Sequence, residues 1–104
     1  MIKKKSYDGV VVAARYTHQG KIDWVRAYER HGFVFSDRVM MDRETLVGHI
    51  REGKRFKTGE RMAYQGNDFR INADIRLIEN DGDSVIVAGE MLSKQDSLGN
   101  LPII

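Results

Sequence analysis

The sequence predicts a small, mainly β domain with one short α-helix, on three observations. Residues 7–17 and 21–30 are rich in β-branched and aromatic residues and flank a turn at Gly20. Residues 69–78 alternate apolar with polar side chains, which gives a strand one dry face and one wet face. Asp42 precedes the one stretch that carries helix start and stop signals. The expected order is three strands, one helix, and two or three further strands.

That order suits a partly open five- or six-stranded antiparallel barrel, or a curved sheet packed on one helix. It is OB-like by element order only. The chain has 104 residues, which is the length of one domain. We expect a basic lead-in at residues 1–6 and a single folded domain at 7–89. Residues 90–104 lose apolar periodicity and are expected to form a loosely attached tail. The alternative is that its apolar residues dock on the fold, namely Leu92, Leu98, Leu101, Ile103 and Ile104.

The first hairpin is expected to turn at Thr17 to Lys21, which fits a three-residue loop with Gly20 in the left-handed conformation. A two-residue turn would instead change the register and mix the two faces. The three-residue loop predicts the pairs Tyr16–Ile22, Arg15–Asp23, Ala14–Trp24, Ala13–Val25 and Val12–Arg26, with Arg15 and Asp23 as a cross-strand ion pair. One face would then carry Val10, Val12, Ala14, Tyr16, Ile22, Trp24, Arg26 and Tyr28.

The helix is expected at about residues 43–52. Asp42 is a good N-cap, Glu44 sits where the helix dipole favours negative charge, and Gly53 can end the helix. The remaining strands are expected at Phe33–Met41, 69–78 and Ser84–Ala88, with turns at 65–67 and 80–83. Phe56–Tyr64 is expected to be either a strand or an irregular edge.

Composition limits location and chemistry. The chain has no cysteine, which excludes disulfides and thiolate metal sites and suits a reducing compartment. It has no apolar run of signal-peptide or membrane-spanning length. We therefore expect a cytoplasmic protein that does not use a membrane as partner. A net charge of +2 permits a nucleic-acid partner without requiring one.

Catalytic and metal signatures are weak. The three histidines lack ligand-like spacing, no serine lies in a nucleophile elbow, and residues 79–83 lack the spacing of a calcium loop. We therefore expect no enzyme activity, no cofactor and no metal.

Two groups of residues are candidate binding surfaces. Tyr16, Trp24, Arg26 and Tyr28 interleave aromatic rings with arginine, which is typical of a stacking platform for single-stranded bases. The alternative is that these rings are core and that Arg26 extends to the edge. Lys54, Arg55 and Lys57 follow the helix and are suited to phosphate contacts. Their alternative is a solvated helix exit.

The leading hypothesis is a non-catalytic binding module with single-stranded nucleic acid as its ligand. The alternative hypothesis is a protein-interaction or assembly module, which self-associates or docks a partner through apolar residues of the first hairpin and of the tail. A small-molecule pocket at the barrel mouth is a third, minor option.

Overall fold

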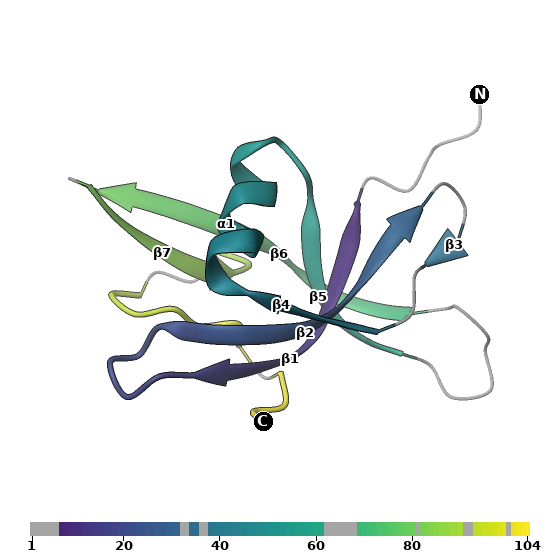
Figure 1. Cartoon of the computed structure of the whole chain (residues 1–104), viewed down its shortest axis with the longest axis horizontal. Coiled ribbons are helices and arrows are strands. Elements are labelled where there is room, and N and C mark those ends of the chain that lie inside the picture. Colours follow the sequence, from purple (N-terminus) through teal and green to yellow (C-terminus); the bar gives the residue numbers. More distant parts are fainter. Residues whose placement is uncertain are drawn as a thin grey trace.

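The structure is a computed structural model that describes residues 7–31, 34–35, 38–61, 69–80, 82–90, 93–99 and 101–104 (Figure 1). Its strands are β1 (Gly9–Tyr16), β2 (Ile22–His31), β3 (Val34–Phe35), β4 (Val39–Asp42), β5 (Phe56–Arg61), β6 (Phe69–Asn80) and β7 (Asp83–Ala88). The helix is α1 (Arg43–Arg51), between β4 and β5. The predicted mainly β class and element order are confirmed.

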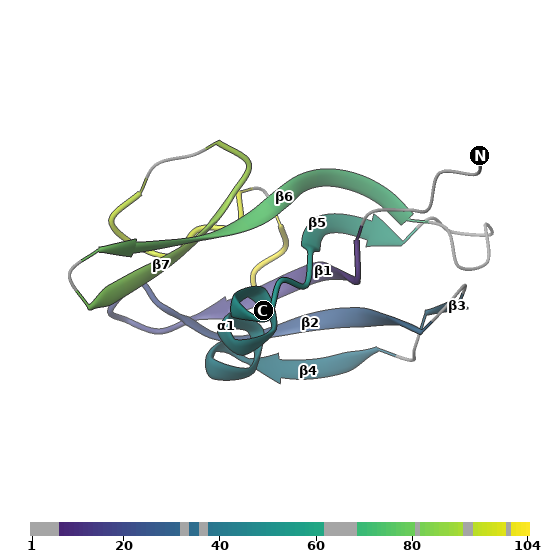
Figure 2. The ribbon, with the colours of Figure 1, turned by 90° about the horizontal axis from the view of Figure 1, so that it is seen from above.

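The strands form one curved, open sheet in the order β3-β2-β1-β5-β6-β7, with β4 pairing β2 beside β3. Neighbouring strands are antiparallel except for β1 and β5, which are parallel. Figure 2 shows β6 and β7 above β1, β2 and β4, with β5 joining the two halves. The likeness to an OB-fold is limited to the order of the elements.

Helix α1 closes the core between the two halves of the sheet. Leu46 and Val47 are buried, and they pack in one cluster with Val25 of β2 and Ile86 of β7. The helix begins as predicted, because the N–H of Thr45 donates to the Asp42 carboxylate at 2.8 Å. In the part of the chain that the structure describes, no helix is long and apolar enough to cross a membrane.

The first hairpin turns as predicted but pairs differently in its middle. The N–H of Thr17 donates to the Lys21 carbonyl at 2.7 Å, Gly20 has a φ of 79°, and Tyr16 pairs with Ile22. Asp23 is then an extra residue in β2, and Val12 is an extra residue in β1. The predicted pairs Arg15–Asp23, Ala14–Trp24, Ala13–Val25 and Val12–Arg26 are therefore wrong, and the observed pairs are Arg15–Trp24, Ala14–Val25 and Ala13–Arg26.

These two β-bulges also redistribute the predicted faces, because each inserts one residue into a two-residue repeat. Tyr16 and Ile22 pack against the core, as do Val25 and Ala27 beyond the bulge. Strand alternation then places Trp24, Arg26 and Tyr28 on the opposite face. The expected ion pair of Arg15 with Asp23 still forms, at 3.7 Å and well exposed to solvent.

The other elements follow the predictions with local changes. The single strand expected at Phe33–Met41 is described as the two strands β3 and β4, both paired with β2. Strand β5 ends at Arg61, and the turn expected at 65–67 lies outside the described residues. Strands β6 and β7 form a hairpin that ends on the pair Asn80–Asp83, with Gly82 at a φ of 83°.

The C-terminal segment, which here means residues 93–99 and 101–104, corrects the prediction of a loosely attached tail in its part around Leu98. Leu98 is 1% exposed and Asp96 is 4% exposed. Ser97 extends the edge of β7, since its N–H donates to the Ile86 carbonyl at 2.8 Å. The residues of the segment make different kinds of contact. Its sequence therefore shows no apolar periodicity that would indicate this packing.

Asp96 connects three distant parts of the fold to the C-terminal segment. Its carboxylate accepts the N–H of Ile22 at 2.7 Å and the N–H of Ile86 at 2.9 Å. The guanidinium of Arg43 donates to the same carboxylate at 2.7 Å through Nε, and its Nη2 also donates to the Ser84 carbonyl at 2.8 Å. The first hairpin, α1 and β7 are thereby held to one buried charged group.

Replacement of two glycines by alanine should change the stability in opposite directions. A Cβ at Gly59 would lie 2.6 Å from the backbone carbonyl oxygen of Arg70, which the β5–β6 pairing holds in place, whereas a Cβ at Gly48 in α1 would meet nothing within 4 Å. We expect Gly59→Ala to lower the free energy of unfolding by about 1–3 kcal/mol. Gly48→Ala should raise it by about 0.5–1 kcal/mol, because alanine restricts the unfolded chain. Urea denaturation of both variants checks this, and a Gly59→Ala protein as stable as the parent would contradict the close approach of β5 to β6.

Candidate functional site

A cavity of about 450 Å³ lies where the chain leaves α1 and enters β5. Among the residues that the structure describes, four positively charged side chains and a single carboxylate line it. The lining residues are Lys54, Arg55, Phe56, Lys57, Asp74, Ile75 and Arg76, and this is called the basic pocket below. Three of its cations are those that the sequence singled out after the helix.

Backbone contacts fix the loop that carries Lys54 and Arg55. The N–H of Lys54 donates to the His49 carbonyl at 3.0 Å, and Gly53 before it has a φ of 92°. The N–H of Arg55 donates to the Asp8 carboxylate at 2.8 Å, while the Arg55 carbonyl accepts the Asp8 N–H at 2.6 Å. The loop backbone is held against the start of β1, and the side chains of Lys54 and Arg55 remain exposed.

Strand pairing adds the remaining charged groups. Lys57 of β5 lies opposite Asp74 of β6, and the Lys57 ammonium is 2.9 Å from the Asp74 carboxylate. The Lys57 side chain is 22% exposed and that of Asp74 is 65% exposed. Arg76 donates through Nε to the Gly89 carbonyl. Two of the cations are therefore held in defined positions before any ligand arrives.

An aromatic ring lies beside the basic pocket. The Lys57 ammonium and the Arg30 guanidinium each lie 5.9 Å from the centre of the Tyr7 ring, within cation–π range. Arg30 also donates to the Tyr7 carbonyl at 3.3 Å. The ring is half-buried and is held close to one of the pocket's cations.

Sequence reasoning did not identify Tyr7, Asp74 or Arg76 as part of a site. Asp74 and Arg76 occupied the polar positions of an alternating strand, which is also the pattern of an ordinary solvated face. Only the pairing of β5 with β6 brings these two side chains to Lys57. The local sequence pattern contains no signal that β5 pairs with β6, because the paired residues lie far apart in the chain.

The predicted aromatic surface of the hairpin is divided. Tyr16 packs against the core and accepts the N–H of Leu98 at 3.0 Å, and burial raises the pKa of its hydroxyl. Tyr28 is 9% exposed, and its ring lies 5.0 Å from that of Phe69. Trp24 and Arg26 are half-buried on the same face as Tyr28. The four residues do not form one platform.

Over the described ranges, no three His, Cys, Asp or Glu side chains come together as metal ligands. Comparison of the chain with protein-family models, with curated proteins and with solved structures gives no match. Among the described residues, the basic pocket is the feature whose geometry and charge point to a function.

Proposed function

We propose that this chain is a non-catalytic binding module that holds the phosphates of single-stranded nucleic acid in the basic pocket. The observation that supports this is the convergence of Lys54, Arg55, Lys57 and Arg76 on one cavity with one carboxylate. Phosphate contacts from lysine and arginine supply most of the sequence-independent affinity of nucleic-acid-binding proteins. A volume of about 450 Å³ is within the range of small-ligand sites.

Two features favour a single strand over a duplex. The Tyr7 ring lies next to Lys57, so an unstacked base adjacent to a bound phosphate has an aromatic surface within reach. Lys57 is also the lateral neighbour of Val10, which pairs with Tyr28. Val10 and Tyr28 are buried, and Arg26 and Trp24 follow them on the same face as half-buried side chains, so a second aromatic ring lies on the face that carries Lys57.

Fluorescence anisotropy with a labelled single-stranded oligonucleotide tests the proposal. Three or four phosphate contacts predict a slope of about −2 to −3 for the logarithm of the association constant against that of the salt concentration. The same labelled strand annealed to its complement should bind more weakly. An oligonucleotide that does not bind at low salt would rule out the proposed function.

Charge reversal in the pocket should weaken binding. Arg55 is exposed, and its side chain makes no hydrogen bond or ion pair with the described residues. We therefore expect Arg55→Glu to fold normally and to lose roughly tenfold in affinity, about 1.4 kcal/mol. The salt slope should fall by about 0.7 because one phosphate contact is lost. Lys94→Glu, an equal change of charge at an exposed residue that does not line the pocket, is the control. Equal losses in the two variants would place the binding elsewhere.

Removal of the pocket's carboxylate should strengthen binding. Asp74 engages Lys57 at 2.9 Å and repels phosphate, so we expect Asp74→Asn to raise the affinity roughly twofold to fivefold. Asp23→Asn removes the same charge from an exposed ion pair on the first hairpin and should leave the affinity nearly unchanged. A fall in affinity for Asp74→Asn would show that Lys57 needs Asp74 to bind.

A further inference from the structure

The edge of β1 has two successive neighbours. Strand β5 pairs with it in parallel from Gly9 to Val11, and at Ala14 the neighbour is Ile103 of the C-terminal segment, also in parallel. The Ala14 N–H donates to the Pro102 carbonyl at 3.0 Å, and the Ile104 N–H donates to the Ala14 carbonyl at 2.9 Å. Residues 101–104 therefore occupy a strand position along β1.

Within the described part of the chain, few interactions hold residues 101–104 in this position. The two backbone hydrogen bonds join them to Ala14, and Leu101 is half-buried against the core. Ile103 is 74% exposed, so its side chain contributes little apolar burial. We therefore expect residues 101–104 to separate from the sheet edge more easily than the part of the segment around Leu98, which is buried.

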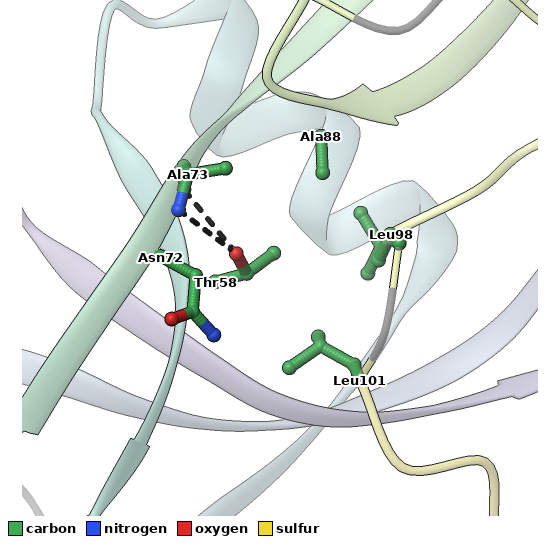
Figure 3. A pocket seen from close by; sticks show the side chains of 7 residues that line it. Thr58, Asn72, Ala73, Ala88, Leu98 and Leu101 are labelled. Atoms are coloured by element: carbon green, nitrogen blue, oxygen red, sulfur yellow. Dashed lines mark hydrogen bonds between the residues drawn. The ribbon is translucent and has the colours of Figure 1, made fainter.

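The side chain of Leu101 also leaves unfilled space beside it. A cavity of about 410 Å³ lies between the C-terminal segment and the facing strands β5, β6 and β7 (Figure 3). In Figure 3, Leu98 and Leu101 lie on one side of the cavity, Thr58, Asn72 and Ala73 lie on the other, and Ala88 lies beside Leu98. The Thr58 hydroxyl is already engaged, because it accepts the N–H of Ala73, and the Asn72 amide is the other polar side chain of the lining. A larger apolar side chain at the place of Leu101 has room to extend into this cavity.

We propose that the β1 edge at Ala14 is a docking site for an extended peptide, and that residues 101–104 are its resident occupant. The partner runs parallel to β1, makes the two backbone hydrogen bonds to Ala14, and places a bulkier apolar side chain where Leu101 lies. Backbone hydrogen bonds provide the affinity of such strand addition, and the side-chain pocket provides its specificity. This inference does not depend on nucleic-acid binding, because Ala14 is not among the residues of the basic pocket.

NMR titration of the full chain with synthetic peptides tests the docking site. The probes are peptides of residues 99–104 with Leu101 kept or replaced by Phe. We expect the Ala14 amide resonance to shift on titration, and the Phe peptide to bind several-fold more tightly than the Leu peptide. A Phe peptide that also carries Pro in place of Ile104 lacks the donated N–H and should lose the shift. Absence of any change at Ala14 with the Phe peptide would overturn the proposal.

The full-length variant Leu101→Phe provides a second measurement that needs no added peptide. If the cavity accepts the larger side chain, the variant should melt at a higher temperature than the parent and should resist displacement by the Phe peptide. A lower melting temperature would show that the space beside Leu101 does not accommodate the ring, and would also overturn the proposal.

Discussion

Asp96→Asn should lower the free energy of unfolding by about 3–5 kcal/mol, the loss expected when one partner of a buried ion pair is removed. The Asp96 side chain is fully buried, and its two oxygens accept the N–H groups of Ile22 and Ile86 as well as the Arg43 guanidinium. Asparagine has one acceptor oxygen in place of two. Its NH2 group would face a donor N–H, and Arg43 would lose its counter-charge.

The control is Asp23→Asn, which makes the same chemical change in an exposed ion pair 3.7 Å long. That variant should lose less than about 1 kcal/mol. Urea denaturation followed by the fluorescence of Trp24 measures both proteins. Similar midpoints for Asp96→Asn and Asp23→Asn would mean that the carboxylate of Asp96 is not enclosed in solution.

The parent protein should also lose stability in acid, and the variant should lose less. Burial of the Asp96 carboxylate opposes its ionisation, but hydrogen bonds from Arg43, Ile22 and Ile86 outweigh this and hold its pKa below the ordinary value. The unfolded chain then binds a proton more readily than the folded chain. The stabilisation is complete above the unfolded pKa of about 3.9 and is lost as the pH falls below it towards the folded pKa. The difference in stability between parent and Asp96→Asn should therefore shrink below about pH 4.

Leu98→Ala should lower the free energy of unfolding by about 2–5 kcal/mol. Leu98 is 1% exposed and belongs to the core cluster, and its truncation would enlarge the cavity that it already lines. Thermal and urea denaturation give the value. The large loss is expected because the surrounding strands are paired and cannot close around the missing methyl groups.

Ile103→Ala is the matched control within the same segment. Its side chain is 74% exposed, and the change should remain within about 0.5 kcal/mol of the parent. A Leu98→Ala protein no less stable than Ile103→Ala would mean that the segment is detached in solution, as the sequence alone had indicated.

The local parts of the fold were predictable from the sequence. Asp42 and Gly53 delimit α1 through capping chemistry that involves only neighbouring residues, and Gly20 determines the turn between β1 and β2 for the same reason. The strand at Phe69 follows from a two-residue repeat that stays visible despite a bulge. Each of these signals lies within a few residues of the feature that it specifies.

The parts that were wrong or missed depend on contacts between distant residues. The bulges at Asp23 and Val12 compensate one another, so the register is as predicted at both ends of the hairpin and shifted only between them. Nothing in the local pattern marks those two positions. The buried Asp96 reads as a surface residue in sequence, because aspartate is mostly exposed unless it is paired, and its partner Arg43 is 53 residues away.

The candidate site shows the same division. Lys54, Arg55 and Lys57 were predictable because they are close together in the chain, and the basic pocket contains all three. The hairpin group was predicted as one surface, and a single inserted residue at Asp23 was enough to place Tyr16 on the other side of the sheet from Trp24. A prediction about a shared face is therefore only as reliable as the register beneath it.

The bond from Ile22 to Asp96 spans 74 residues, and it has a consequence for how the protein is made. During translation the first hairpin emerges early, but the group that satisfies its Ile22 amide emerges only after β7 has been synthesised. Until then the Ile22 amide has no hydrogen-bond acceptor, and the apolar side chains that pack against Leu98 are exposed to solvent. A recombinant fragment that stops before Ser93 should therefore be recovered mainly in inclusion bodies, whereas one that reaches Gly99 should be recovered in solution.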